Sequence, residues 1–145
     1  MNAKGLMTSS PTVIRRADTI GHAAKIMASS DVGMLPVVDE QDENRLVGVL
    51  TDRDIVIRCT AKNHDTKTCL VETHMTTESL TTVRSSADLS EIAQKMETSQ
   101  VRRLPVIDAD DHVIGVVSQA DLARFVGPDN PELVEQVLER ISTPA

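Results

Sequence analysis

The feature that most constrains the fold is an internal repeat. An apolar stripe with helical spacing occurs twice in the chain, and its two copies match position by position. In each copy the apolar residues fall at i, i+3, i+4 and i+7, which places them on one face of an amphipathic helix. The chain therefore contains two versions of one structural unit. The stripes are Ile20, Ala23, Ala24 and Met27 in the first copy, and Leu89, Ile92, Ala93 and Met96 in the second.

Two short β-branched runs follow the helix in each copy and indicate a hairpin with an acidic turn. The first run of each pair begins Leu-Pro, and proline is tolerated at the start or edge of a strand. The second run leads directly into another helical segment. The matching segments are residues 35–39 with 104–108, residues 46–51 with 113–118, and residues 51–55 with 118–122.

Each copy thus predicts the order strand, helix, strand, strand, helix, which makes the fold class α/β (α+β). Neither copy is long enough for a comfortable core alone, so we expect the two to pack their sheets together with approximate two-fold symmetry. We place the repeats at residues 7–64 and 73–127. Residues 130–142 begin with Asn-Pro and continue with apolar residues at helical spacing. They predict a C-terminal helix that docks on the module or on a partner chain.

Composition restricts the functions that this chain can have. Its net charge is −7, and it contains a single phenylalanine and neither Trp nor Tyr. A negative field repels phosphate backbones, and the lack of aromatic platforms disfavours base stacking. No run approaches the about 20 apolar residues that a membrane span needs, and no targeting signal is visible. Two cysteines do not make a disulfide framework. We therefore expect a cytoplasmic protein that binds neither nucleic acid nor membranes.

A hydroxyl and a carboxylate recur three residues apart where each hairpin meets its second helix. These pairs are Thr51 with Asp54 and Ser118 with Asp121. The pattern is that of a capping box, which satisfies free amides at a helix start. The same place can also bind a ligand, because a helix N-terminus attracts phosphate and a carboxylate accepts hydrogen bonds from both hydroxyls of a ribose. The two interpretations can hold together.

Paired arginines distinguish the second copy from the first. Arg102 and Arg103 directly precede a core strand, and arginine is suited to bidentate phosphate contacts. A solvated surface pair is the alternative interpretation. The first copy has Gly33 and Met34 at the matching positions and offers Arg53 instead.

Four possible metal ligands are evenly spaced by five residues: Cys59, His64, Cys69 and His74. A zinc site is one interpretation. However, this spacing matches no established C-x-x-C pattern and places the residues on no single helix face, so we predict no metal site. A buried free thiol is the simpler role for Cys59, and a disulfide between the two cysteines is possible. No catalytic Ser/His/Asp or Cys/His arrangement is legible, so we do not expect an enzyme.

Residues 48–55, 100–108 and 115–122 closely resemble bacterial CBS-domain pairs (Bateman modules), in particular stand-alone proteins that consist of two CBS domains. The resemblance covers about residues 7–126. It implies clefts between the two sheets that bind adenosine-containing ligands such as AMP, ADP and ATP, and sometimes S-adenosylmethionine or NAD. It also implies that two modules associate through their helices into a disc-like dimer.

The resemblance further implies a role for individual residues. The ribose-binding acid of the family corresponds to Asp54 and Asp121, and its hydroxyl to Thr51 and Ser118. Because the first copy lacks the paired arginines, an anionic ligand there would depend on Arg53 and backbone amides. The residues that the resemblance places near phosphate are Arg102 and Arg103, and those near the base are Val101 and Pro105, with Thr82 as a weaker candidate.

We therefore predict a non-enzymatic regulatory module that requires no cofactor. It binds AMP or ATP mainly at Arg102, Arg103, Ser118 and Asp121, forms a homodimer and signals to an unknown partner protein. A different hypothesis is a stress-associated dimeric interaction protein whose clefts stay empty. A third is a zinc-binding variant that uses Cys59 and the nearby histidines.

Overall fold

The computed structural model describes residues 1–42, 44–78 and 80–142 of the chain. The chain divides into two compact units, which we name after the repeats that they contain. The first-repeat unit is Pro11–Leu80. The second-repeat unit joins Met1–Ser10 to the chain from Thr81 onward, so the start of the chain packs with the repeat that is more distant in sequence.

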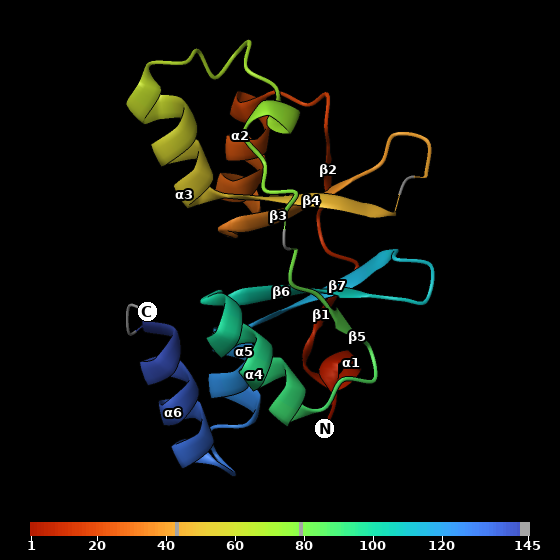
Figure 1. Ribbon diagram of the computed structural model, residues 1–145, viewed down its shortest axis with the longest axis vertical. Coiled ribbons are helices and arrows are strands. Elements are labelled where there is room, and N and C mark those ends of the chain that lie inside the picture. Colours follow the sequence, from red (N-terminus) through yellow and green to blue (C-terminus); the bar gives the residue numbers. More distant parts are fainter. Residues whose placement is uncertain (43, 79, 143–145) are drawn as a thin grey trace. The chain divides into compact units, whose positions relative to one another are not determined.

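The first-repeat unit is a three-stranded sheet in the order β2-β3-β4, with helices on one face (Figure 1). Strands β2 and β3 are parallel, whereas β3 and β4 form the predicted antiparallel hairpin. After α3 the chain continues in a π-helical turn and then a 3₁₀ turn. The elements are β2 (Ile14–Arg15), α2 (Ile20–Ser30), β3 (Met34–Val38), β4 (Leu46–Thr51), α3 (Asp52–Asp54), the π-helical turn Ile55–Cys59 and the 3₁₀ turns Thr60–Lys62 and Val71–Thr73.

The second-repeat unit has a four-stranded sheet in the order β1-β7-β6-β5. Strands β5 and β6 are parallel and β6 and β7 antiparallel, as in the first repeat, while β1 adds an antiparallel edge strand beside β7. The elements are α1 (Ala3–Leu6), β1 (Thr8–Ser9), β5 (Val83–Arg84), α4 (Leu89–Ser99), β6 (Arg103–Ile107), β7 (Val113–Ser118), α5 (Gln119–Phe125) and α6 (Pro131–Ser142).

The two amphipathic helices form as their apolar stripes predict. In α2 the residues Ile20, Ala23 and Met27 are buried, and Thr19 caps the helix by accepting a hydrogen bond from the third residue. In α4 the equivalent stripe is buried and Asp88 is the cap. Both helices end at a residue in the left-handed conformation, which closes the last turn and turns the chain toward the following strand.

The C-terminal helix α6 docks on its own unit. Its apolar face, formed by Val134, Val137 and Ile141, is buried against α4 and α5. Arg140 adds an ion pair of 3.0 Å to Glu97 of α4. Of the two possibilities that the sequence left open, docking on the module or on a partner chain, the structure shows docking on the module. The predicted fold class, with two copies of strand, helix, strand, strand, helix, is confirmed.

The sequence did not predict the role of Met1–Ser10. Helix α1 buries Ala3 and Leu6 in the core of the second-repeat unit, and β1 completes its sheet. Within the described part of the chain, no helix is long and apolar enough to cross a bilayer.

Candidate functional site

The capping box of the first repeat lies at the junction of β4 and α3. The Thr51 hydroxyl accepts from the Asp54 amide (3.1 Å), and the Thr51 amide donates to Oδ2 of Asp54 (3.0 Å). The other oxygen, Oδ1, lies 3.8 Å from Nε of Arg58 one helical turn later. The carboxylate of Asp54 is therefore fixed through one oxygen, while the second has only a loose ionic contact.

The capping box of the second repeat holds its acid more tightly. Oδ2 of Asp121 accepts from both the amide (2.8 Å) and the hydroxyl (2.9 Å) of Ser118. Oδ1 accepts from the Arg124 guanidinium at 2.8 Å. Asp121 is only 4% exposed. A ribose that uses this carboxylate must exchange with the Arg124 contact, because all the short hydrogen bonds to Asp121 are already made.

The paired arginines lie beside this second box. Arg103 is directly opposite Ser118 in the β6–β7 ladder, and the carbonyl of Arg102 accepts from the first amide of α5, that of Gln119 (2.9 Å). Both arginine side chains are exposed. Within the described part of the chain, neither guanidinium has an ion-pair partner. Two exposed positive charges thus lie at the N-terminus of α5, where helix amides also favour an anion.

The first repeat has the same backbone geometry without the charge. Met34 lies opposite Thr51, and the carbonyl of Gly33 accepts from the Asp52 amide (2.9 Å). Arg53 is exposed on α3. The structure therefore reproduces the asymmetry between the copies that the sequence indicates.

The remaining predicted residues of the second repeat lie at the same end of the sheet. Pro105 is buried in β6, and Val101 is half-buried just before this strand. Thr82 directly precedes β5, which runs parallel to β6, so it lies at the end of the sheet where β6 begins. The carbonyl of Thr82 accepts from Nζ of Lys95 (2.7 Å).

The sequence analysis did not identify two arginines, one beside each capping box. Arg58 and Arg124 follow the acids of the two boxes by four and three residues, and both contact them. Such spacing is typical of ion pairs along a helix, so the sequence carried a signal that could have revealed them.

A second group of polar side chains gathers in the first-repeat unit. Donor atoms of Cys59, Cys69 and His74 all lie within 4.8 Å of one another, and both thiols are free. Nδ1 of His64 is 3.1 Å from Nε2 of His74. Burial raises the pKa of the Cys59 thiol, and the neighbouring Cys69 adds to this effect. These residues share no helix face, as the sequence indicates, yet the loop after Cys59 folds back and brings them together.

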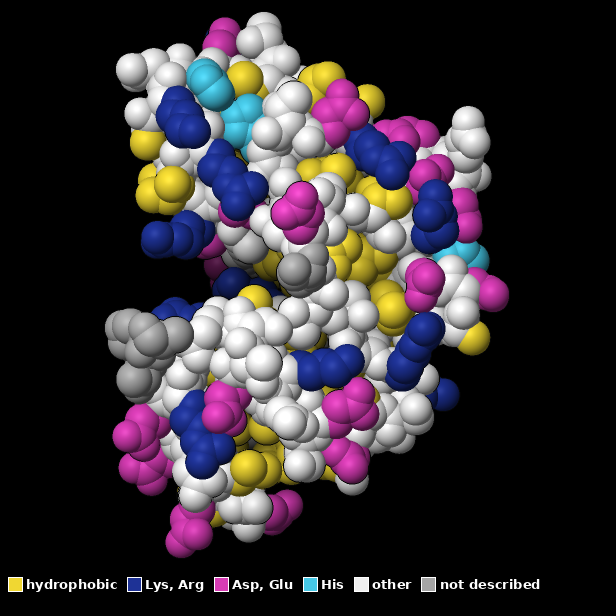
Figure 2. Space-filling view, in the orientation of Figure 1, with side chains coloured by type: hydrophobic (Ala, Val, Ile, Leu, Met, Phe, Trp, Pro, Cys, Tyr) yellow, Lys and Arg dark blue, Asp and Glu magenta, His cyan; other side chains and the backbone are white. Residues whose placement is uncertain are grey.

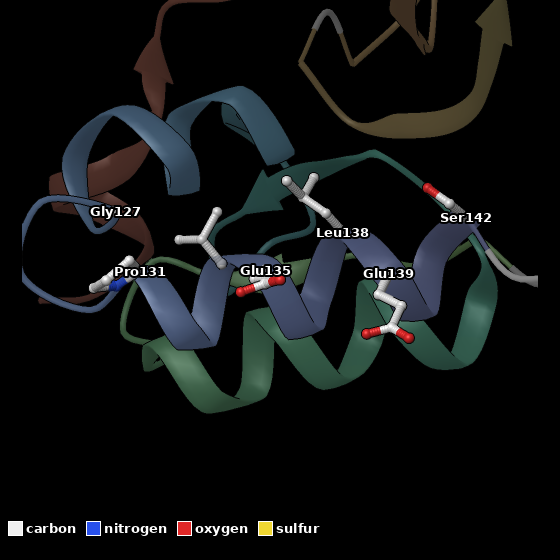
Figure 3. Close-up of a pocket in the computed structure, with 7 residues that line it drawn as sticks. Gly127, Pro131, Glu135, Leu138, Glu139 and Ser142 are labelled. Atoms are coloured by element: carbon white, nitrogen blue, oxygen red, sulfur yellow. The ribbon is translucent and has the colours of Figure 1, made fainter.

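Surface hollows beside α6 do not coincide with the predicted site. One, of about 560 Å³, runs along α6 and is bordered by Glu135, Leu138 and Glu139 (Figure 3). The other, of about 510 Å³, lies between α4 and α6 and includes Glu97 and Arg140. Glutamates in both linings disfavour a phosphate ligand.

Charges of both signs are interspersed over the face drawn in Figure 2. Among the described residues on that face, no broad patch of positive side chains is present in either unit.

Comparison with known proteins identifies the repeated unit. The family model of the CBS domain matches residues 3–59 and 71–128. Hypoxic response protein 1 of Mycobacterium tuberculosis is 36% identical over 124 residues, which cover 86% of this chain and 84% of the relative. The chain thus belongs to the CBS-domain family, as a pair of CBS domains.

Solved structures agree with this assignment. The structure of Hypoxic Response Protein I, described with two coordinated zinc ions, has a TM-score of 0.77 at 35% identity and covers 86% of this chain and 98% of that one. The CBS-domain pair of protein MJ0100, in complex with 5′-methylthioadenosine and S-adenosylmethionine, has a TM-score of 0.77 at 29% identity (88% and 100% covered). CBSX2 in complex with AMP has a TM-score of 0.73 at 27% identity (86% and 95% covered).

Proposed function

We propose that this chain is a non-enzymatic regulatory module that binds an adenosine 5′-phosphate, AMP or ATP, at the second repeat and signals to a partner protein. The observation that carries the proposal is the pair of exposed guanidiniums of Arg102 and Arg103 beside the Ser118–Asp121 box, for which the described residues supply no ion-pair partner. Two family members that were crystallised with adenosine compounds support the ligand class. If no such ligand binds, the alternative hypothesis applies, namely a dimeric interaction protein whose clefts stay empty.

Each part of the ligand has a matching group. Arg102 and Arg103 can form bidentate contacts with phosphate. The first amides of α5, at the positive end of the helix dipole, also attract phosphate. Asp121 is the acceptor for the ribose hydroxyls. Pro105 and Val101 offer apolar surface for the base, with Thr82 at the neighbouring strand. At the first repeat, Thr51, Asp54 and Arg53 form a weaker version of the same site.

Occupancy of the second site has a structural consequence that a regulatory module needs. A ribose that takes Oδ1 of Asp121 displaces Arg124, whose guanidinium also lies 5.2 Å from the ring centroid of Phe125. The Phe125 side chain is 47% exposed. Ligand binding therefore changes the surface of α5, so a partner that contacts this surface binds the two states with different affinity.

We include homodimerisation and a cytoplasmic location in the proposal. Large apolar side chains are exposed on the helical segments that close each repeat, Val56 (56%) and Ile57 (48%) in the first and Phe125 in the second. Exposed apolar residues on helices favour association with a second copy. Free thiols at Cys59 and Cys69 fit a reducing compartment.

The ligand proposal is tested by thermal unfolding with AMP, ATP, S-adenosylmethionine and NAD. A ligand at 100 times its dissociation constant adds about 2.7 kcal/mol, which raises the Tm by about 5–10 °C for a chain of this size. We expect R103A and D121N each to weaken nucleotide binding tenfold or more. K25A is the control, because Lys25 is an exposed cation of α2 outside both capping boxes, and we expect it to leave the Tm increase with nucleotide unchanged. No shift with any adenosine compound would contradict the proposal. A shift retained by both R103A and D121N would place the ligand elsewhere.

A further inference from the structure

Donor atoms of Cys59, Cys69 and His74 converge in the first-repeat unit, and Nδ1 of His64 lies beside Nε2 of His74. Cys59 ends the π-helical turn after α3, Cys69 lies in the following loop, and His74 comes directly after the 3₁₀ turn Val71–Thr73. Cys59 is 0% and His74 is 4% exposed. This group of a buried thiol, a half-buried thiol and a buried imidazole has no role in the capping boxes, so it requires a separate explanation.

Backbone hydrogen bonds fix the loop that carries these donors. The amide of His64 donates to the carbonyl of Cys59 (3.1 Å), and the amide of Cys69 donates to Asp65 (2.9 Å). The carbonyl of Cys69 accepts from the first amide of α2, that of Ile20 (2.9 Å). The donors are therefore held in place before any ligand binds, which reduces the entropic cost of binding one.

The hydrogen bonds of His74 determine which of its nitrogens is free. The Thr73 hydroxyl donates its proton to the carbonyl of Leu70 (2.7 Å), so it can only accept from Nδ1 of His74, which lies 2.7 Å away. Nδ1 thus carries the ring proton, and the lone pair of Nε2 faces Nδ1 of His64. This is how metal-binding histidines are oriented in proteins, through a hydrogen bond from the nitrogen that does not bind the metal.

His64 supplies the fourth donor. Its Nδ1 lies 3.1 Å from Nε2 of His74, and the rings meet edge to face. Zinc–nitrogen bonds of about 2.0–2.1 Å place two nitrogen ligands of a tetrahedral ion about 3.3–3.4 Å apart. The observed separation of the two nitrogens is close to that value, although His64 itself is exposed on the loop.

We propose that Cys59, His64, Cys69 and His74 bind one zinc ion in a tetrahedral Cys₂His₂ site. A donor set of two thiolates and two imidazoles binds zinc in preference to magnesium or calcium. On binding, each thiol releases one proton and the sulfur donates an electron pair to the metal, with no change in oxidation state. A site with four protein ligands leaves no open position for substrate, so the ion has a structural role: it links the helical segment after α3 to the loop before β5.

The other group of potential ligands does not match this pattern. Asp108, Asp110 and His112 also bring donor atoms within reach of one another, at the β6–β7 turn. Oδ1 of Asp108 already accepts from the amides of Asp110 and His112 (both 2.9 Å), which is the ordinary chemistry of a turn. We assign no ligand to it.

The test uses the full chain in reducing buffer without nucleotide, so its result is independent of the Asp121 site. The protein is stripped with a chelator and then titrated with zinc or cobalt. We expect one metal ion per chain by elemental analysis, a higher Tm with zinc, and the absorption bands of tetrahedral thiolate-bound cobalt. H22A is the control, because His22 is an exposed histidine of the same unit outside the cluster.

Variants of the less buried ligands keep the test interpretable, since a change at buried Cys59 can disturb folding. We expect C69S and H64A to fold without metal and to bind zinc at least tenfold more weakly, and C69S to weaken the thiolate–cobalt bands. T73V, which removes the hydrogen bond that orients His74, should weaken zinc binding about 10–100-fold. A chain that binds no stoichiometric zinc overturns the site. Equal affinity in wild type and C69S does so too, as does a Cys59–Cys69 disulfide that persists in reducing buffer.

Discussion

At the scale of single residues, an aspartate in each hairpin turn accepts hydrogen bonds from backbone amides of that turn. Oδ1 of Asp39 accepts from the amides of Gln41 (2.8 Å) and Asp42 (3.2 Å), and its Oδ2 pairs with Arg16 and Arg45. These amides, followed by the arginines, lower the pKa of Asp39 to about 2. Asp108 occupies the same place in the second repeat, and the amide of His112 is the main cause of its lowered pKa.

The lowered pKa of Asp39 predicts a dependence of stability on acid. In the unfolded chain this carboxyl takes up a proton near pH 4, whereas in the folded chain it remains ionised to about pH 2. Protons therefore bind preferentially to the unfolded chain, and the free energy of unfolding falls as the pH decreases through this window. We expect D39N to lose this contribution and to show a shallower slope between pH 4 and 2, measured by denaturant unfolding at a series of pH values. An unchanged slope in D39N would contradict this account.

The sequence predicted much of the site at this scale, but not all of it. The Thr51 and Ser118 boxes and the position of Arg103 follow from local pattern, because capping and strand register depend on nearby residues. The state of His74 depends on the Thr73 hydroxyl and the Leu70 carbonyl, whose geometry is set by the packed loop. Spacing along the chain contains no information about such a rotamer.

At the scale of elements, strand β4 approaches residues 75 and 76 closely, and this approach depends on the glycine at position 48. A Cβ at Gly48 would lie 2.9 Å from Sδ of Met75 and 3.0 Å from the carbonyl oxygen of Thr76. That segment is held to β4 by two hydrogen bonds between Val49 and Thr76 (3.0 and 2.8 Å). The methionine end can move, but the backbone carbonyl can move only if this bridge is disturbed.

We therefore expect G48A to destabilise the first-repeat unit by about 1–3 kcal/mol, the usual cost of forcing extra volume into a packed site. G5A provides the comparison, because a Cβ at Gly5 would make an ordinary contact of 3.6 Å with Met1, and alanine favours a helix. The measurement is chemical denaturation of both variants. Equal stability of G48A and wild type would show that the β4 contact is looser than described here.

Element order and helix faces were predictable from periodicity, whereas the partner of each element was not. The α2 and α4 stripes identify buried faces directly. Strand β1 has only two residues, and α1 has four, so neither has enough length for a periodic signal. Their places in the second sheet are decided by long-range packing of residues such as Leu6.

At the scale of the whole molecule, the second-repeat unit depends on residues that precede the first repeat. Ala3 is 0% and Leu6 is 1% exposed, and β1 pairs with β7. Removal of residues 1–9 takes these apolar side chains out of the core and exposes the edge of β7. We expect a loss of about 2–4 kcal/mol, since a buried leucine alone contributes about 1.5–3 kcal/mol.

Hydrogen exchange measured by mass spectrometry can locate this loss. The amides of α4, β7 and α5 should exchange faster in the truncated chain, while those of α2 and β3 should keep their protection. The point variant L6A should reproduce the pattern to a smaller extent. A uniform loss of protection in both units would contradict the division into units described above.

The discontinuous make-up of the second-repeat unit also sets an order of assembly during translation. Pro11–Leu80 is one uninterrupted stretch, so its unit can close as soon as that stretch has left the ribosome. Met1–Ser10 emerges earlier but has no sheet to join until β7 has been synthesised, and it then closes a loop around an already folded repeat. The nascent chain thus presents Leu6 and its neighbours uncovered until β7 has been made, and the second CBS domain is completed by a segment that is synthesised before the first.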